Sequence, residues 1–179
     1  MDNNYQIEFM KESHQIEFMK ESYQNVNNWL VYAETKNAAL LAFNVTTIAA
    51  VTRFQFFFIN YILLIFYVIA IVSPLISFLP KFRVFMKNQN EITLDKDNLL
   101  FYKDISKYSP ENYIRKIDSR YQLNIEMIDD KYPNIIFDYA QEIVTNAKIA
   151  VWKYAVFRVG LVSSIFCILL TIISRMECI

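Results

Sequence analysis

Glycine, histidine and cysteine are scarce in this sequence of 179 residues. It contains one glycine, one histidine and two cysteines, which are Gly160, His14, Cys167 and Cys178. Rossmann and P-loop folds need several glycines where the backbone approaches a phosphate, so both folds are excluded. The few histidines and cysteines leave no metal cluster, no Cys–His dyad and no disulfide framework. We therefore expect a protein that is not an enzyme and that holds no metal or resident cofactor.

Charge is also missing from the middle of the chain, although 18 basic residues balance 18 acidic ones overall. Between Lys36 and Lys81 the only ionised side chain is Arg53. Three segments carry no charge at all, and they cover residues 37–52, 54–80 and 159–174. With 55% hydrophobic residues, the composition is too apolar for an ordinary soluble domain.

The uncharged segments predict membrane spans. A helix needs about 20 residues to cross a hydrocarbon core of about 30 Å, so the middle segment spans easily. The two shorter segments span if flanking basic side chains reach the interface along their apolar stems. A soluble helical bundle is the alternative, but runs such as 56–58 and 62–66 show no polar face. We predict an all-α membrane protein with three transmembrane helices, at about 37–53, 55–79 and 155–174.

The basic residues near the span ends predict the orientation. Lys36 and the basic residues between Lys81 and Arg158 outnumber Arg53 and Arg175, so the positive-inside rule places the N-terminus in the cytoplasm. Four parts follow along the chain. They are an acidic N-terminal extension (1–28), an interfacial helix with a transmembrane hairpin (29–80), a small, mostly helical cytoplasmic sensing portion (81–148), and the third span with the C-terminus (149–179).

The N-terminal extension contains a duplicated octapeptide. Residues 6–13 read QIEFMKES and residues 15–22 repeat the same letters. The repeat period of nine residues corresponds to about 900° on an α-helix, so the two copies present the same side chains to opposite faces. Two interpretations stay open: a tandem duplication in a helical extension without further role, or a segment for self-association.

Local signals in the cytoplasmic portion predict three elements. The apolar and aromatic residues 99–102 predict a strand. Ser109 followed by Pro110 marks a helix start, and that helix should run to about Tyr121. A final helix should begin near Asn134. Its apolar stripe at spacings of three and four consists of Ile136, Ala140, Ile143, Ala147 and Ala150. No helix breaker separates it from the third span, so we expect one long final helix that is continuous with that span.

Polar residues inside the first span are candidates for a pore or gate. Asn37, Asn44 and Thr47 share one face. They either make hydrogen bonds between helices of a bundle or line a water-filled pore in an oligomer. Glu34 and Lys36 precede the span and are expected to form a latch at its mouth. On the last span, Gly160, Ser164, Cys167 and Thr171 form a small-residue face that predicts close helix packing.

Basic and aromatic residues of the cytoplasmic portion are candidates for nucleotide binding. A nucleotide needs cations for its phosphates and a ring for its base. The candidate cations are Lys103, Arg115, Lys116 and Arg120, and the candidate rings are Tyr102 and Tyr113. The alternative is a solvated charged face, because the portion is nearly neutral overall. We expect no binding of duplex nucleic acid. His14, in the N-terminal extension, is expected to be structural or incidental.

Taken in order, several motifs resemble the transmembrane effectors of the bacterial Pycsar anti-phage system, the PycTM family. The segment 32–41, YAETKNAALL, resembles that family's A-D-x-K-A opening, with Glu34 where the family usually has aspartate. The Leu-Pro-Lys exit at 79–81, the NLLF and SPENY motifs at 98–113, and the stretch 141–154 leading into the last span are also similar to the family.

The resemblance implies a function. Such a protein would be a homo-oligomeric effector in the bacterial inner membrane, and it would answer to a regulatory nucleotide, either a cyclic mononucleotide or an oligonucleotide. A separate cyclase or nucleotidyltransferase would make that signal. The effector would form a pore or disrupt the bilayer and so cause abortive infection. The alternative function is a non-conducting membrane anchor or regulatory partner of a soluble protein.

Overall fold

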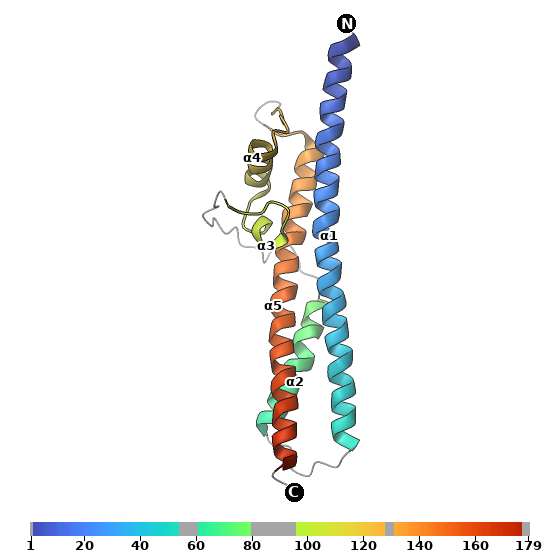
Figure 1. Ribbon diagram of the computed structural model, residues 1–179, viewed down its shortest axis with the longest axis vertical. Coiled ribbons are helices and arrows are strands. Elements are labelled where there is room, and N and C mark those ends of the chain that lie inside the picture. Colours follow the sequence, from blue (N-terminus) through green and yellow to red (C-terminus); the bar gives the residue numbers. More distant parts are fainter. Residues whose placement is uncertain (1, 54–60, 80–95, 128–130, 177–179) are drawn as a thin grey trace. The chain divides into compact units, whose positions relative to one another are not determined.

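The computed structural model describes residues 2–53, 61–79, 96–127 and 131–176. Their secondary structure is helical, in line with the predicted fold class. The five helices are α1 (Asp2–Arg53), α2 (Tyr61–Ser77), α3 (Tyr102–Ile105), α4 (Pro110–Tyr121) and α5 (Asn134–Met176) (Figure 1). The long final helix expected from the missing breaker is therefore present as α5.

The chain divides into two compact units, which we describe separately. Unit 1 consists of residues 1–30 and 82–151, and unit 2 of residues 31–81 and 152–179. The helices α1 and α5 each supply residues to both units. The acidic extension, the interfacial helix and the first predicted span are thus parts of one helix, α1.

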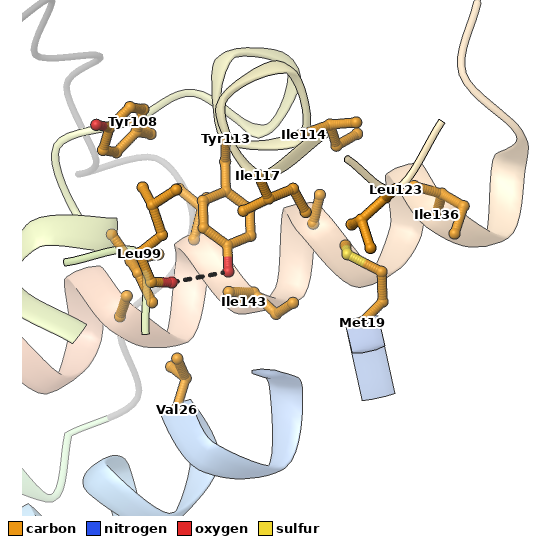
Figure 2. Close-up of a cluster of buried hydrophobic side chains, with 14 of the residues drawn as sticks. Met19, Val26, Leu99, Tyr108, Tyr113, Ile114, Ile117, Leu123, Ile136 and Ile143 are labelled. Atoms are coloured by element: carbon orange, nitrogen blue, oxygen red, sulfur yellow. Dashed lines mark hydrogen bonds between the residues drawn. The ribbon is translucent and has the colours of Figure 1, made fainter. Parts of the chain in front are cut away.

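The core of unit 1 is built around α4. Ser109 caps this helix, since its side chain accepts a hydrogen bond from the amide of Asn112, and Pro110 occupies the first turn. These are the cap and start that the sequence predicts, and the helix ends at Tyr121 as expected. Figure 2 shows Tyr113 of α4 in the middle of the cluster, donating a hydrogen bond of 3.1 Å to the carbonyl oxygen of Leu99.

The two long helices, α1 and α5, also contribute buried side chains to this core. Met19 and Val26 of α1 are fully buried in it, together with Ile117 of α4 (Figure 2). The predicted stripe of α5 is confirmed, because all five of its members are buried. They are Ile136, Ala140, Ile143, Ala147 and Ala150.

The predicted strand at 99–102 is wrong. The side-chain oxygen of Asn98 accepts a hydrogen bond from the amide of Leu100, and its carbonyl oxygen accepts one from the amide of Phe101. These bonds fold the backbone into a turn that leads directly into α3 at Tyr102. An asparagine bonding to its own neighbouring backbone supplies the local alternative to a strand.

The two octapeptide copies do face opposite ways. In the second copy, Gln15 and Met19 are buried, and Gln15 donates two hydrogen bonds of 2.9 Å to the carbonyl oxygens of Leu123 and Asn124. In the first copy, by contrast, the equivalent Met10 is exposed. Identical sequences therefore have different environments, as the half-turn offset predicts.

Unit 2 contains the helices that the sequence assigns to the membrane. Among the described residues, one helix is long and apolar enough to cross a bilayer, and it lies within α5 at Asn134–Ile173. The first predicted span lies at the end of α1. Of the second predicted span, the apolar helix Leu63–Ser77 is described, while 55–60 lies outside the described residues. The structure thus establishes one candidate span, and the other two remain predictions.

Truncating the core of unit 1 tests this packing. Ile117→Ala should lower the free energy of unfolding by about 2–5 kcal/mol, because it removes a fully buried side chain from a close-packed cluster. The control is Ile135→Ala, which removes a similar side chain from an exposed position and should cost less than about 0.5 kcal/mol. Denaturant unfolding of the full chain in detergent, followed by tryptophan fluorescence, measures both. Equal losses would contradict the assigned core.

Candidate functional site

A buried lysine joins the three helices of unit 2. Only 7% of Lys153 on α5 is exposed. Its ammonium group donates hydrogen bonds to the carboxylate of Glu34 on α1, at 2.7 Å, and to the carbonyl oxygen of Ser77, at 2.9 Å. Ser77 ends α2, so its carbonyl oxygen has no partner within the helix and needs a donor from elsewhere. Lys153 thus neutralises one carboxylate and caps one helix.

Asn37 lies on the same side of α1 and ties that helix to the backbone of α5. Its amide nitrogen donates to the carbonyl oxygen of Ala33, at 2.9 Å, and to that of Lys153, at 3.2 Å. The residue is fully buried, and its side-chain oxygen has no hydrogen-bond partner among the residues that the structure describes. An unsatisfied buried acceptor costs free energy, so this contact between helices is less than fully stabilising.

Asn44 repeats the connection two turns further along α1. It donates a hydrogen bond of 2.7 Å to the carbonyl oxygen of Ala70 on α2, and it accepts one of 2.7 Å from the hydroxyl group of Ser164 on α5. Its oxygen and its nitrogen are therefore both bonded to other helices. We call Glu34, Asn37, Asn44, Ser77, Lys153 and Ser164 the polar seam.

The outward-facing side chains of unit 2 are apolar, which reverses the usual pattern of a soluble protein. On α5 the exposed large apolar residues are Val159, Leu161, Val162, Ile165, Phe166, Leu169, Ile172 and Ile173. On α2 they include Leu64, Ile65, Val68, Val72, Leu75 and Ile76. The interior holds the polar seam beside an apolar cluster of Leu63, Tyr67 and Cys167. An apolar outer surface with hydrogen-bonded polar groups inside is the arrangement expected of helices packed in lipid.

Close helix packing beside the polar seam depends on the single glycine. A Cβ atom added to Gly160 would lie 3.1 Å from the side chain of Leu40 on α1 and 3.3 Å from those of Ser73 and Pro74 on α2. Cys167, which shares the small-residue face, is buried as well. The predicted role of this face in helix packing is confirmed.

The structure places the predicted pore and gate residues inside one protomer. Asn37 and Asn44 are buried between helices, as the helix-bonding alternative describes. Thr47 donates its hydroxyl hydrogen bond within its own helix, to the carbonyl oxygen of Phe43. The ammonium group of Lys36 lies 4.5 Å from the ring centroid of Tyr32 rather than beside Glu34. Pore lining in an oligomer stays a prediction.

A second polar cluster lies in unit 1 around Asp97, which is buried. Its carboxylate accepts hydrogen bonds from Lys107, at 2.9 Å, and from the hydroxyl group of Tyr108, at 3.1 Å. Lys107 also pairs with Asp104 at 2.8 Å, and Arg120 donates to the backbone carbonyl oxygen of Asp97. We call these five residues the Asp97 cluster.

The Asp97 cluster changes the proton affinity of two of its members. Hydrogen bonds to Asp104 and then to Asp97 raise the pKa of Lys107 well above its ordinary value. Burial, followed by the hydrogen bond to Asp97, raises the pKa of Tyr108 from 10.0 to about 12. Both groups are thus held in their protonated forms.

The predicted nucleotide-binding residues differ in accessibility. The side chains of Lys103 and Arg115 are exposed, and Lys116 is half-buried. Arg120 is exposed but bonded within the Asp97 cluster. Tyr113 is fully buried in the core.

Tyr102 packs against neighbouring rings instead. It is half-buried, with its ring centroid 5.3 Å from that of Trp29 and 4.7 Å from that of Phe101. The described structure therefore presents the charges of Lys103 and Arg115 to solvent and withholds the ring of Tyr113.

Two central residues of these clusters, Lys153 and Asp97, are not among the site residues that the sequence predicts. Lys153 lies three residues after Ala150 and seven before Gly160, so it falls on the buried stripe of α5. A lysine on such a stripe indicates a buried cation with a partner, and this signal was available. Asp97 offers no comparable signal, because its partners Lys107 and Arg120 lie 10 and 23 residues away.

The inverted polarity of unit 2, the apolar helix within α5 and the polar seam define a helical, membrane-associated protein. Comparison with known families identifies it further: the chain belongs to the PycTM family, described as the Pycsar effector protein domain, which matches residues 18–176. The suspected family is thereby confirmed, and the match makes the chain an effector of the Pycsar anti-phage type. No curated protein and no solved structure matches the chain.

The Glu34–Lys153 pair predicts an asymmetric response to mutation. Glu34→Ala leaves a buried ammonium group with one acceptor, so it should lower the free energy of unfolding by about 2 kcal/mol or more. Lys153→Met leaves a carboxylate that is 45% exposed and can be hydrated, so it should cost clearly less. Thermal unfolding of both variants in detergent measures the difference. The reverse order would show that Lys153 is not buried as described.

The Asp97 cluster predicts instability at high pH. Tyr108 ionises near pH 10 in the unfolded chain but near pH 12 in the folded one, so its contribution is complete below pH 10 and disappears as the pH rises toward 12. The raised pKa of Lys107 acts in the same direction. Stability should therefore fall between pH 10 and 12, and less steeply in Tyr108→Phe. Unfolding at a series of pH values measures this, and identical slopes would contradict it.

Proposed function

We propose that this protein is a nucleotide-controlled membrane effector that permeabilises the bacterial inner membrane as a homo-oligomer and so causes abortive infection. Membership of the Pycsar effector family and the apolar exterior of unit 2 support this proposal. In this proposal the chain crosses the membrane three times, with its N-terminus and residues 81–148 in the cytoplasm.

The polar seam is the single observation that carries the mechanism. Hydrogen bonds made by Glu34, Asn37 and Asn44 hold α1 against α2 and α5. The outer surface of these helices is mostly apolar. In lipid, groups released from such bonds must find other partners or water. The helices therefore favour discrete arrangements over gradual ones, and a second arrangement that exposes the seam to water would be a conducting one.

Control by a ligand requires a connection from the cytoplasmic portion to the seam. Helix α5 runs without interruption from Ile136 in the core of unit 1 to Lys153 and Ser164 in the seam. A ligand that binds one arrangement of α5 more tightly than the other would shift the population of the seam. We propose α5 as the element whose position the ligand selects.

The proposed ligand is a cyclic mononucleotide or an oligonucleotide made by a separate cyclase or nucleotidyltransferase. The exposed charges of Lys103 on α3 and Arg115 on α4 are suited to phosphate, and Lys116 follows Arg115 on α4. Tyr102 is the ring suited to stack on a base, because it is only half-buried, whereas Tyr113 is enclosed in the core.

A non-conducting membrane anchor is a second candidate, and one observation favours it. The oxygen and the nitrogen of Asn44 are both bonded within a single protomer, which is what pure helix-to-helix bonding requires. Such a protein would hold a soluble partner at the membrane. It would need no second arrangement of the seam.

Ion flux separates the two candidates. The full chain would be reconstituted in liposomes loaded with an ion-sensitive dye, and the four cyclic mononucleotides and a set of cyclic oligonucleotides would be added in turn. An effector should show at least a tenfold change in flux with one of them. Asn44→Leu should abolish that response, because leucine can bond to neither Ala70 nor Ser164.

Thr46→Val is the matched control, since among the described residues the hydroxyl group of Thr46 bonds to carbonyl oxygens of its own helix, those of Ala42 and Phe43. This variant should respond like the unchanged protein. Liposomes that stay impermeable with every nucleotide would overturn the effector proposal and leave the anchor.

A further inference from the structure

The first octapeptide copy leaves large apolar side chains uncovered. Phe9 is 73% exposed and Met10 is 62% exposed. Among the side chains of α1 that the structure describes, Gln15 is the first buried one.

The repeat period determines where Phe9 points. Nine residues turn an α-helix by about 900°, which places Phe9 on the side opposite Phe18 and about 13.5 Å nearer the N-terminus. Phe18 packs its ring against Tyr121 at the end of α4, with a centroid distance of 5.1 Å. Phe9 is therefore directed away from the Tyr121 of its own chain.

A hollow of about 330 Å³ lies beside that same tyrosine. Its lining includes Met10 and His14 of α1 and, beyond α4, Leu123 and Asn124. The exposed lining is mostly apolar. A cavity of roughly 150 Å³ is enough to hold a benzene ring, so this hollow has room for one phenyl side chain.

The first copy cannot take the place of the second on its own chain. A shift of α1 by nine residues would bring Met10 to the position of Met19, but it would also bring Glu17 to that of Val26. Val26 is fully buried in the apolar core, and a carboxylate there would have no partner. The same buried carboxylate without a partner rules out an arrangement in which the first copy of one chain replaces the second copy of another chain.

We propose that Phe9 of one protomer inserts into the hollow beside Tyr121 of a second copy of this chain. The Phe18–Tyr121 contact shows that the octapeptide phenylalanine packs on this tyrosine. The duplication gives the chain a second such phenylalanine on the free side of the helix. The hollow and the phenylalanine lie on different sides of α1, so the contact joins unlike surfaces of the two copies.

Charge complementarity supports the same partner. Glu12 follows Phe9 by three residues, so it lies on the same side of the helix. Lys11 and His14 line the hollow. Insertion of Phe9 therefore brings the carboxylate of Glu12 in one copy toward the ammonium group of Lys11 in the other.

A contact between unlike surfaces can propagate, and it forms a closed ring when the rotation between copies permits. The interface thus provides a route to the ring that a pore requires. The inference deepens the proposed function, which requires a homo-oligomer, and it concerns assembly and not conduction. The cross-linking test of this interface can fail while the flux experiment succeeds. The flux experiment can likewise fail while the cross-linking succeeds.

Disulfide cross-linking between two tagged forms of the full chain tests the proposal. Both forms carry Cys167→Ala and Cys178→Ala. One form also carries Phe9→Cys and the other His14→Cys, and the two are coexpressed and oxidised in membranes. The expected product is the mixed dimer. Its yield should exceed by at least tenfold that of a control pair in which Met127→Cys, at another exposed apolar position of unit 1, replaces His14→Cys.

Two outcomes overturn the proposal. A preference for dimers between two Phe9→Cys chains would show that like surfaces meet. A mixed dimer no more abundant than in the control pair would show that Phe9 does not reach the hollow.

Two variants without cysteines measure the strength of the contact. Phe9→Ala removes the inserted ring, and His14→Trp fills the hollow from an exposed position. Each should raise the protein concentration needed for assembly by tenfold or more, as expected for loss of one buried phenyl group. Met127→Ala should leave it unchanged. Analytical ultracentrifugation in detergent measures all three, and an unchanged midpoint for both test variants would contradict the proposal.

Discussion

The ammonium group of Lys153 is the interaction on which the arrangement of unit 2 depends. A buried cation requires compensation, and here it comes from the carboxylate of Glu34 and from the carbonyl oxygen that ends α2. Three helices are thereby joined at one point, in addition to the apolar contacts among Leu63, Tyr67 and Cys167. The polar contacts matter because many exposed side chains of the unit are apolar as well, so apolar contact alone does not select one packing over another.

Helix α5 meets two different physical demands along its length. In unit 1 it buries Ile136 and Ile143 in an apolar core, where the loss of contact with water drives packing. In unit 2 it buries Lys153 and Ser164 and exposes its apolar side chains. The family match covers both regions of the helix without a break. In the proposed function, this continuous helix is the element that connects ligand binding with membrane permeability.

Much of the fold could be predicted from local patterns. The cap at Ser109, the stripe of α5 and the opposite faces of the duplicated octapeptide all follow from helical geometry and nearest neighbours. The strand predicted at 99–102 failed because Asn98 bonds to the following backbone, a choice that apolar composition does not reveal. The candidate site was predicted less well. Asn37 and Asn44 were identified, but their partners were not, and Glu34 was matched with Lys36 instead of Lys153.

The sequence by itself determined that this is a helical chain with membrane-compatible segments, because helix period, caps and missing charge are properties of neighbouring residues. It also carried enough ordered motifs to identify the family. Only the tertiary structure decided which polar groups meet. Glu34 and Lys153 are separated by 119 residues, and Asn44 and Ser164 by 120. Such contacts depend on how distant helices pack, and a single sequence contains no local signal for the distance between them.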